Sequence, residues 1–165
     1  MSKSVLILFT VLGSAAGLAA AQPSVRVEPA TVQGPRVLES QTATAAIRDY
    51  FESWVAMRSA LDENRADLLD RDFIGDAKEK LTDTIQQQSK LGIRTVYQDR
   101  AHDLQIVFYS PDGLSIELTD TVDYDVQLFA GDKLQAAQPQ HARYIVVLTP
   151  AEVRWRVRVL QAAQK

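Results

Sequence analysis

RYIVVLTPAEVRWRVRVLQ, residues 143–161, is the stretch of this sequence that decides its fold. Val, Ile, Tyr and Trp dominate both halves, and such residues favour the pleated, half-buried surface of a β-sheet. Pro150 suits the second position of a type I turn, because its fixed φ already matches that position. The stretch therefore predicts a β-hairpin whose loop is made of Pro150 and Ala151.

The length of this loop decides which side chains share a face of the hairpin. A two-residue loop sets Leu148 opposite Val153, and a four-residue loop keeps the same faces, whereas a bulge would turn one arm over. With a loop of either two or four residues, one face of the hairpin is apolar and points toward the core. That expected core face consists of Tyr144, Val146, Leu148, Trp155, Val157 and Val159.

The opposite face of the second arm carries a row of arginines, Arg154, Arg156 and Arg158. One interpretation is a solvated strand face whose charges discourage aggregation. The other is a docking surface for an acidic protein partner. The alternation of the strand supports both interpretations equally.

Composition limits the classes of function that remain open. The chain has 165 residues, 46% of them hydrophobic and 24% charged, which is enough for one domain with a real core. The formal charge of −3 gives no nucleic-acid signature. The absence of cysteine excludes disulfides, thiolate catalysis and cysteine-based metal sites. No cofactor is predicted.

Residues 1–21 have the three parts of a secretory signal peptide. Lys3 supplies the positive charge, an apolar run follows, and Ala19-Ala20-Ala21 forms a small-residue cleavage site. The apolar run is short for a membrane span, which disfavours an uncleaved anchor. We therefore expect cleavage after Ala21, a periplasmic or secreted protein, and no stable membrane anchor after cleavage.

The rest of the chain divides into an arm, one domain and a short tail. Residues 22–42 contain three prolines and no sustained period, which predicts a linker or loose arm, with a weak strand signal at residues 24–27. Residues 43–161 form the domain, and residues 162–165 form the tail.

The domain begins with helical periodicity. Residues 44–61 place an aromatic stripe that includes Tyr50 and Trp54 on one face, a pattern typical of a helix packed on a core. Residues 66–70 predict one or two helical turns, and residues 75–91 predict a second helix. Gly92 follows that helix at the position where a glycine commonly ends one.

The strands follow the helices. Residues 94–100 and 104–109 predict two short strands, and residues 130–140 predict a polar loop. Between them, residues 114–129 alternate apolar and polar side chains with a period of two, and Asp120 is the exception on the apolar side. Either a bulge turns Asp120 outward to water, or Asp120 is a carboxylate on the core face.

This layout resembles the nuclear transport factor 2-like superfamily, a cone-shaped α+β fold in which N-terminal helices pack on a curved antiparallel β-sheet. Within it, the chain is most similar to the IMS-type domains of chloroplast-division proteins and their bacterial relatives. The sequences that carry the resemblance are AAIRDYFESWVAMRSAL, LGIRTVY and ARYIVVLTPAEVRWRVRVLQ. The resemblance implies an accessory, protein-binding role and leaves a homodimer through the sheet face open.

Two functions from different classes follow. The first is an exported, non-enzymatic module that binds an unknown protein or a small hydrophobic ligand. The second is a small isomerase-, cyclase- or dehydratase-like enzyme in which Asp120 lies inside the cone, where burial raises a carboxylate pKa and permits proton transfer. The candidate pocket residues are Tyr50, Trp54, Asp120, Tyr124, Tyr144 and Trp155.

The two histidines do not strengthen the enzyme hypothesis. His102 is expected in an exposed turn between two strands, and His141 at the end of the polar loop. Their spacing does not match a metal site, and the acidic residues from Asp62 to Asp76 lack the pattern of a calcium-binding loop. The sequence therefore predicts no metal site and no catalytic motif of a known kind.

Overall fold

A computed structural model describes residues 21–32, 34 and 36–163. The predicted signal segment falls almost wholly outside these residues. The elements in chain order are β1 (Ser24–Val27), α1 (Ser40–Glu63), the 3₁₀ turn η1 (Ala66–Leu69), α2 (Gly75–Lys90), β2 (Ile93–Tyr109), β3 (Ile116–Ala130), β4 (Lys133–Pro150) and β5 (Trp155–Ala162). The predicted α+β class is confirmed.

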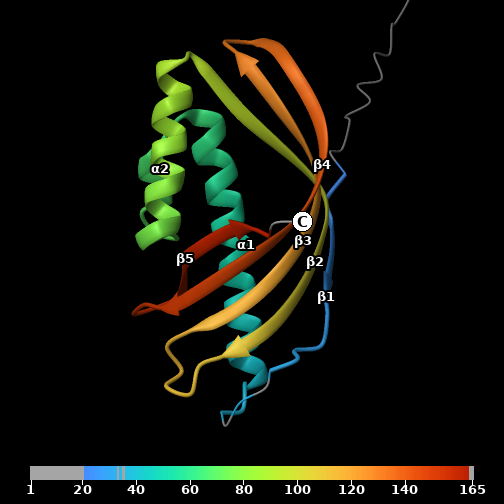
Figure 1. Cartoon of the computed structure of the whole chain (residues 1–165), viewed down its shortest axis with the longest axis vertical. Helices are drawn as coiled ribbons and strands as arrows, with labels where there is room; N and C mark the ends of the chain where they lie inside the picture. Colours follow the sequence, from blue (N-terminus) through green and yellow to red (C-terminus); the bar gives the residue numbers. More distant parts are fainter. Residues whose placement is uncertain (1–20, 33, 35, 164–165) are drawn as a thin grey trace, which may run out of the picture.

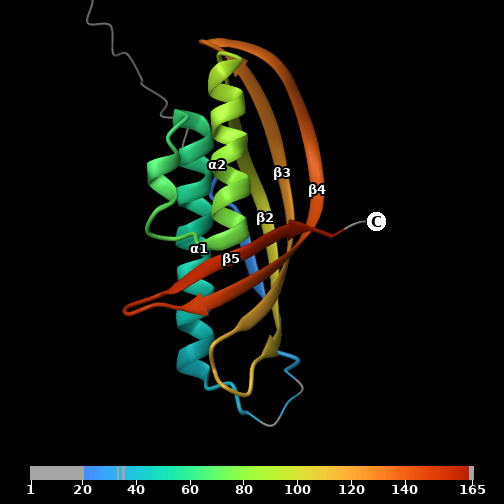
Figure 2. The same ribbon diagram turned by 60° about the vertical axis from the view of Figure 1, so that its left-hand side comes forward.

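Five strands form one sheet in the order β1-β2-β3-β4-β5. The sheet is strongly curved and open, and α1 and α2 lie on its concave side (Figure 1). The expectation of a purely antiparallel sheet needs one correction, because β1 pairs in parallel with residues 101–104 of β2. The weak strand signal in the N-terminal arm is therefore a real edge strand. Figure 2 shows the β4–β5 hairpin reaching across toward the helices.

The strands are longer than the sequence pattern predicts. The two short strands expected at residues 94–109 are one strand, β2, interrupted by bulges at Arg100 and Val107. The expected polar loop is the first half of β4, which pairs with β3 through a tight turn at Gly131, where φ is +56°. Residues 133–139 are exposed on both faces, so their strand has no apolar alternation that sequence reading could detect.

The hairpin at residues 143–161 has a four-residue turn. Leu148 lies opposite Val157 and not opposite Val153, which is 88% exposed at the tip. The even loop keeps the predicted faces, so Leu148 and Val157 are both buried. A bulge beside Val147 then turns the rest of β5 over, and Leu160 packs on the core where Val159 was expected.

The core fills the space between the helices and the concave face of the sheet. The aromatic stripe of α1 supplies Tyr50, Trp54, Met57 and Leu61, all of them buried. Gly92 ends α2 with φ at +65°, as its position in the sequence predicts. No helix within the described ranges is both long and apolar enough to cross a membrane.

Candidate functional site

Asp120 lies inside the core. The alternation of β3 continues through it without interruption, since both bulges of the β2–β3 pair are on β2. Leu118, Asp120 and Val122 therefore share one face, and Asp120 is 0% exposed. The hypothesis that a bulge turns this carboxylate toward water is wrong, and the alternative of a carboxylate on the core face is correct.

Two side chains hold one oxygen of this buried carboxylate. The Tyr50 hydroxyl donates to Asp120 Oδ2 at 2.7 Å, and His102 Nδ1 lies 2.8 Å from the same atom. His102 is 3% exposed, so the prediction of an exposed turn is wrong. The burial of His102 could have been recognised from its spacing of two residues from Leu104 and four from Ile106. All three side chains lie on the apolar face of a continuous β2.

A second carboxylate, Asp99, faces the other side of the imidazole. Its Oδ2 accepts hydrogen bonds from Trp54 Nε1 at 3.0 Å and from Arg58 Nη1 at 2.6 Å. The same oxygen is 3.8 Å from His102 Nε2. The bulge at Arg100 turns Asp99 inward, because one extra residue reverses the faces of the strand. The imidazole thus lies between two buried acids.

This arrangement changes the protonation of the site. Burial by itself lowers the pKa of His102, but the hydrogen bond and charge of Asp120, together with Asp99, outweigh it and raise that pKa to about 9. Burial tends to raise the pKa of Asp99, yet His102 and Arg58 bring it below its ordinary value. Burial and then Asp120 raise the pKa of Tyr50. The raised pKa of His102 favours an imidazolium at neutral pH, and the raised pKa of Tyr50 keeps its phenol neutral.

The thermal stability of the protein is expected to fall as pH rises from 7 to 10. The pKa of His102 is about 9 in the folded chain and about 6.5 when unfolded. Its stabilising contribution is therefore complete below about pH 6.5 and lost as pH rises through 9. Calorimetry across this range should show that the melting temperature of His102→Gln changes less with pH than that of the native chain. If the two melting temperatures change with pH in parallel, His102 is not the group responsible.

Five of the six predicted pocket residues come together. The Trp54 ring centroid is 5.4 Å from that of Tyr144 and 6.4 Å from that of Tyr124, and the two tyrosine hydroxyls are 2.7 Å apart. These rings pack beside Tyr50 and fill the interior next to Asp120. Trp155 lies elsewhere, opposite Pro150, where its backbone N–H donates to Asp49 Oδ2 at 2.8 Å.

A hollow of about 740 Å³ lies at the edge of β2, next to the point where β1 begins. It shares Arg58 and Asp99 with the buried cluster, so the interior network and the surface meet at these two side chains. The bulged segment of β2 forms one wall and the N-terminal arm forms another. The lining residues are Ala21, Gln22, Pro23, Arg58, Gln98, Asp99, Arg100 and Asp125.

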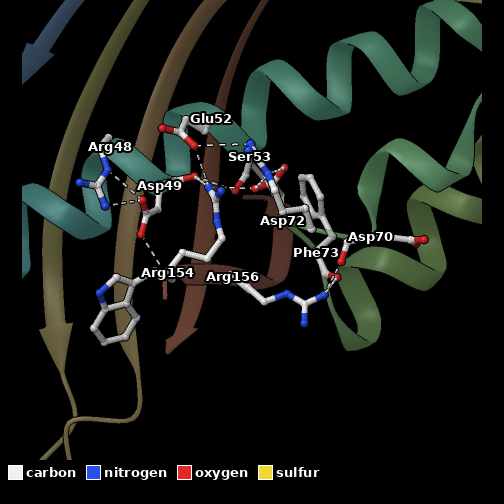
Figure 3. Close-up of polar contacts among 11 residues, drawn as sticks. Arg48, Asp49, Glu52, Ser53, Asp70, Asp72, Phe73, Arg154 and Arg156 are labelled. Carbon is white, nitrogen blue, oxygen red and sulfur yellow. Dashed lines mark hydrogen bonds and ion pairs between the residues drawn. The ribbon is translucent and has the colours of Figure 1, made fainter. Parts of the chain in front are cut away.

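Two arginines of the row, Arg154 and Arg156, contact α1 and the segment before α2 (Figure 3). Arg154 is 11% exposed in its side chain and pairs with Asp72 at 2.8 Å and with Glu52 at 3.2 Å. Arg156 donates to two backbone carbonyls in the segment before α2, those of residues 70 and 73, at 2.6 and 2.9 Å. Arg158 is exposed. A partner surface built on this row would therefore rest mainly on Arg158.

The contacts of β5 explain why Arg154 and Arg156 turn inward. The Val157 N–H donates to the Asp72 carbonyl at 2.8 Å, and the Ile74 N–H donates to the Val157 carbonyl at 3.0 Å. This short parallel bridge covers the outer edge of β5 and brings the acidic segment within reach of the arginines. In the part of the chain that the structure describes, no group of three or more acidic or histidine side chains could hold a metal ion.

No protein-family model and no curated protein matches this sequence. Solved structures with a similar fold include the following three. The intermembrane space region of chloroplast protein ARC6 aligns with 79% of this chain and 100% of its own, at 13% identity and a TM-score of 0.62. A putative scytalone dehydratase from Novosphingobium aromaticivorans aligns with 76% of this chain and 89% of its own, at 13% identity and 0.54. Aln2 from a Streptomyces species aligns with 78% of this chain and 94% of its own, at 10% identity and a TM-score of 0.50.

These identities are low, so the likeness concerns the fold and not the activity. In this chain the fold consists of two helices on the concave side of a long curved sheet and a meander from β2 to β5. The resemblance expected from the sequence is confirmed at this level. The chain has the nuclear transport factor 2-like fold.

Proposed function

We propose that this protein is an exported, non-enzymatic binding module that takes a small ligand at the pocket on the edge of β2. The observation that carries the proposal is the placement of the acid–imidazole cluster. Asp120, His102 and Tyr50 are buried, and both His102 and Tyr50 hydrogen-bond Asp120 Oδ2. A general acid or base has to come within hydrogen-bond distance of its substrate. Aromatic rings occupy the space beside Asp120 that a hydrophobic substrate would need.

The edge pocket differs from the interior in both access and chemistry. It lies at the surface, its volume is in the range of about 300–1,000 Å³ typical of small-molecule sites, and its lining is charged and amide-bearing. The buried cluster holds Asp99 and Arg58 in place from behind. Such support pre-organises a binding wall, which reduces the entropy lost when a ligand binds. The signal-like residues 1–21 support export as part of the proposal.

A second candidate function is an isomerase- or dehydratase-like enzyme that uses Asp120. It is favoured by one specific observation: Asp120, His102 and Tyr50 form a hydrogen-bonded set of the kind that transfers protons. Among the described residues, Asp120 Oδ1 has no hydrogen-bond partner. This candidate requires a substrate to displace the Trp54 or Tyr144 ring, whereas the binding module requires no such rearrangement.

The native chain is expected to retain small molecules from its own compartment. The full sequence is expressed in a bacterium, and mature protein that begins at Gln22 is recovered from the periplasmic fraction. That protein is incubated with a small-molecule extract, and the retained compounds are identified by mass spectrometry. Arg100→Glu should lose them, because it reverses a charge in the pocket wall. The control Arg143→Glu, on an exposed position of β4, should retain them.

Three results would count against the binding module. Failure to recover the protein outside the cytoplasm removes the export part. Retention that does not depend on Arg100 removes the edge pocket. Chemical conversion of a retained compound by the native chain, but not by Asp120→Asn, favours the enzyme, since Asn keeps the size of the side chain and removes its acid–base capacity.

A further inference from the structure

The edge pocket carries two positive and two negative side chains. Arg100 Nη1 donates to Asp125 Oδ1 at 2.6 Å on one wall, and Arg58 Nη1 donates to Asp99 Oδ2 at 2.6 Å on the other. The formal charges of these four lining residues cancel. A pocket without net charge favours neither a simple anion nor a simple cation, whereas a ligand with both charges can be matched on both.

The Arg100–Asp125 ion pair leaves hydrogen-bond donors of the guanidinium unused. A guanidinium has five N–H donors in a planar fork, and Arg100 uses one of them on Asp125. Its side chain is 49% exposed, so the remaining donors face the pocket and solvent. A planar fork of this kind binds a carboxylate through two parallel hydrogen bonds. Arg100 is therefore suited to hold the carboxylate of a ligand.

The deeper wall offers an acceptor. Asp99 is 2% exposed in its side chain, and within residues 21–32, 34 and 36–163 neither Asp99 Oδ1 nor Arg58 Nε has a hydrogen-bond partner. A buried carboxylate oxygen without a hydrogen-bond partner destabilises the structure, and a ligand that donates to this oxygen would relieve that cost. An ammonium or amide N–H provides that donor. The bulge at Arg100 turns Asp99 inward and leaves the Arg100 guanidinium beside it in the lining of the same pocket.

Resting on the proposed function, we infer that the edge pocket binds a zwitterion of the amino-acid or short-peptide type. Its carboxylate lies on Arg100, and its ammonium or first amide N–H lies on Asp99. The volume of about 740 Å³ accommodates more than one residue, which favours a short peptide over a single amino acid.

Isothermal titration of the mature protein with alanine compounds tests this inference. The probes are L-alanine, trialanine, N-acetyl-trialanine and trialanine amide. Trialanine should bind, and removal of either end charge should weaken binding about ten-fold or more. Arg100→Gln should weaken trialanine binding to the same extent. The exposed Arg100 side chain hydrogen-bonds Asp125 on the surface, so its loss leaves the core intact. Arg143→Gln is the matched control and should bind as the native chain does.

Equal affinity for free and capped trialanine would overturn the inference, as would an Arg100→Gln variant with native affinity. If no zwitterion binds at millimolar concentration while extract compounds are still retained through Arg100, the ligand class is wrong and the proposed function stands. If no zwitterion binds and nothing is retained from the extract either, both are wrong.

Discussion

The Asp120→Ala variant is expected to lose about 3–5 kcal/mol of unfolding free energy. The substitution removes the acceptor for the Tyr50 hydroxyl and leaves the His102 imidazolium buried beside a void. Removing one partner of a buried charged pair costs more than the pair contributes, because the remaining charge has lost its hydration without compensation. Urea denaturation followed by tryptophan fluorescence measures the effect.

A matched control for this variant is present on the same strand. Asp123 lies on the opposite face of β3, is 45% exposed in its side chain and pairs with His141. Replacing it with alanine removes an exposed hydrogen bond to His141, and exposed polar contacts of this kind contribute about 0–1 kcal/mol. If Asp120→Ala and Asp123→Ala lose the same free energy, the buried cluster does not stabilise the fold in the way proposed here.

The Arg154→Ala variant is expected to lose roughly 3 kcal/mol. Asp72 is buried, and Arg154 is its shorter ion-pair partner at 2.8 Å, while the solvent-exposed Arg71 lies at 3.3 Å. The loss of Arg154 also leaves Glu52 with Arg71 as its ion-pair partner and loosens the contact between the β4–β5 hairpin and α1. The midpoint of urea unfolding should fall with an unchanged slope, as expected for a loss of stability without a change in the unfolded state.

Arg158→Ala is the control for this second variant. Arg158 belongs to the same row, is exposed, and should change the unfolding free energy by only about 0.5 kcal/mol or less. A double variant of Arg154→Ala with Asp72→Asn should lose less than the sum of the single variants, because the two side chains act as a pair. Strict additivity would show that the pair is not coupled.

Much of the fold follows from periodicity along the chain. The aromatic stripe of α1 and the glycine that ends α2 were predicted at their correct places. The alternation of β3 already placed Asp120 on the apolar side, although it left open whether a bulge would reverse that placement. These features depend on neighbours a few residues apart, and such neighbours are visible in the sequence.

His102 shows where this reasoning fails. The extra residue at Arg100 reverses the faces of β2, so the period is broken just before His102 and the surrounding polar residues resemble a turn. Pairing with β3 keeps the strand continuous and buries the imidazole against Asp120. A bulge is stabilised by the partner strand, and the local sequence does not reveal that partner.

By itself, the sequence determined the class of fold, the helices, the hairpin at residues 143–161 and the core placement of Val146, Leu148 and Val157. Tertiary structure alone decided that Arg154 and Arg156 bind the segment before α2, that Asp99 and Asp120 enclose His102, and that an edge pocket forms. The physical reason is the range of the interactions. Side-chain periodicity is set by the geometry of one element, whereas ion pairs and pockets depend on the register and packing of elements far apart in the chain.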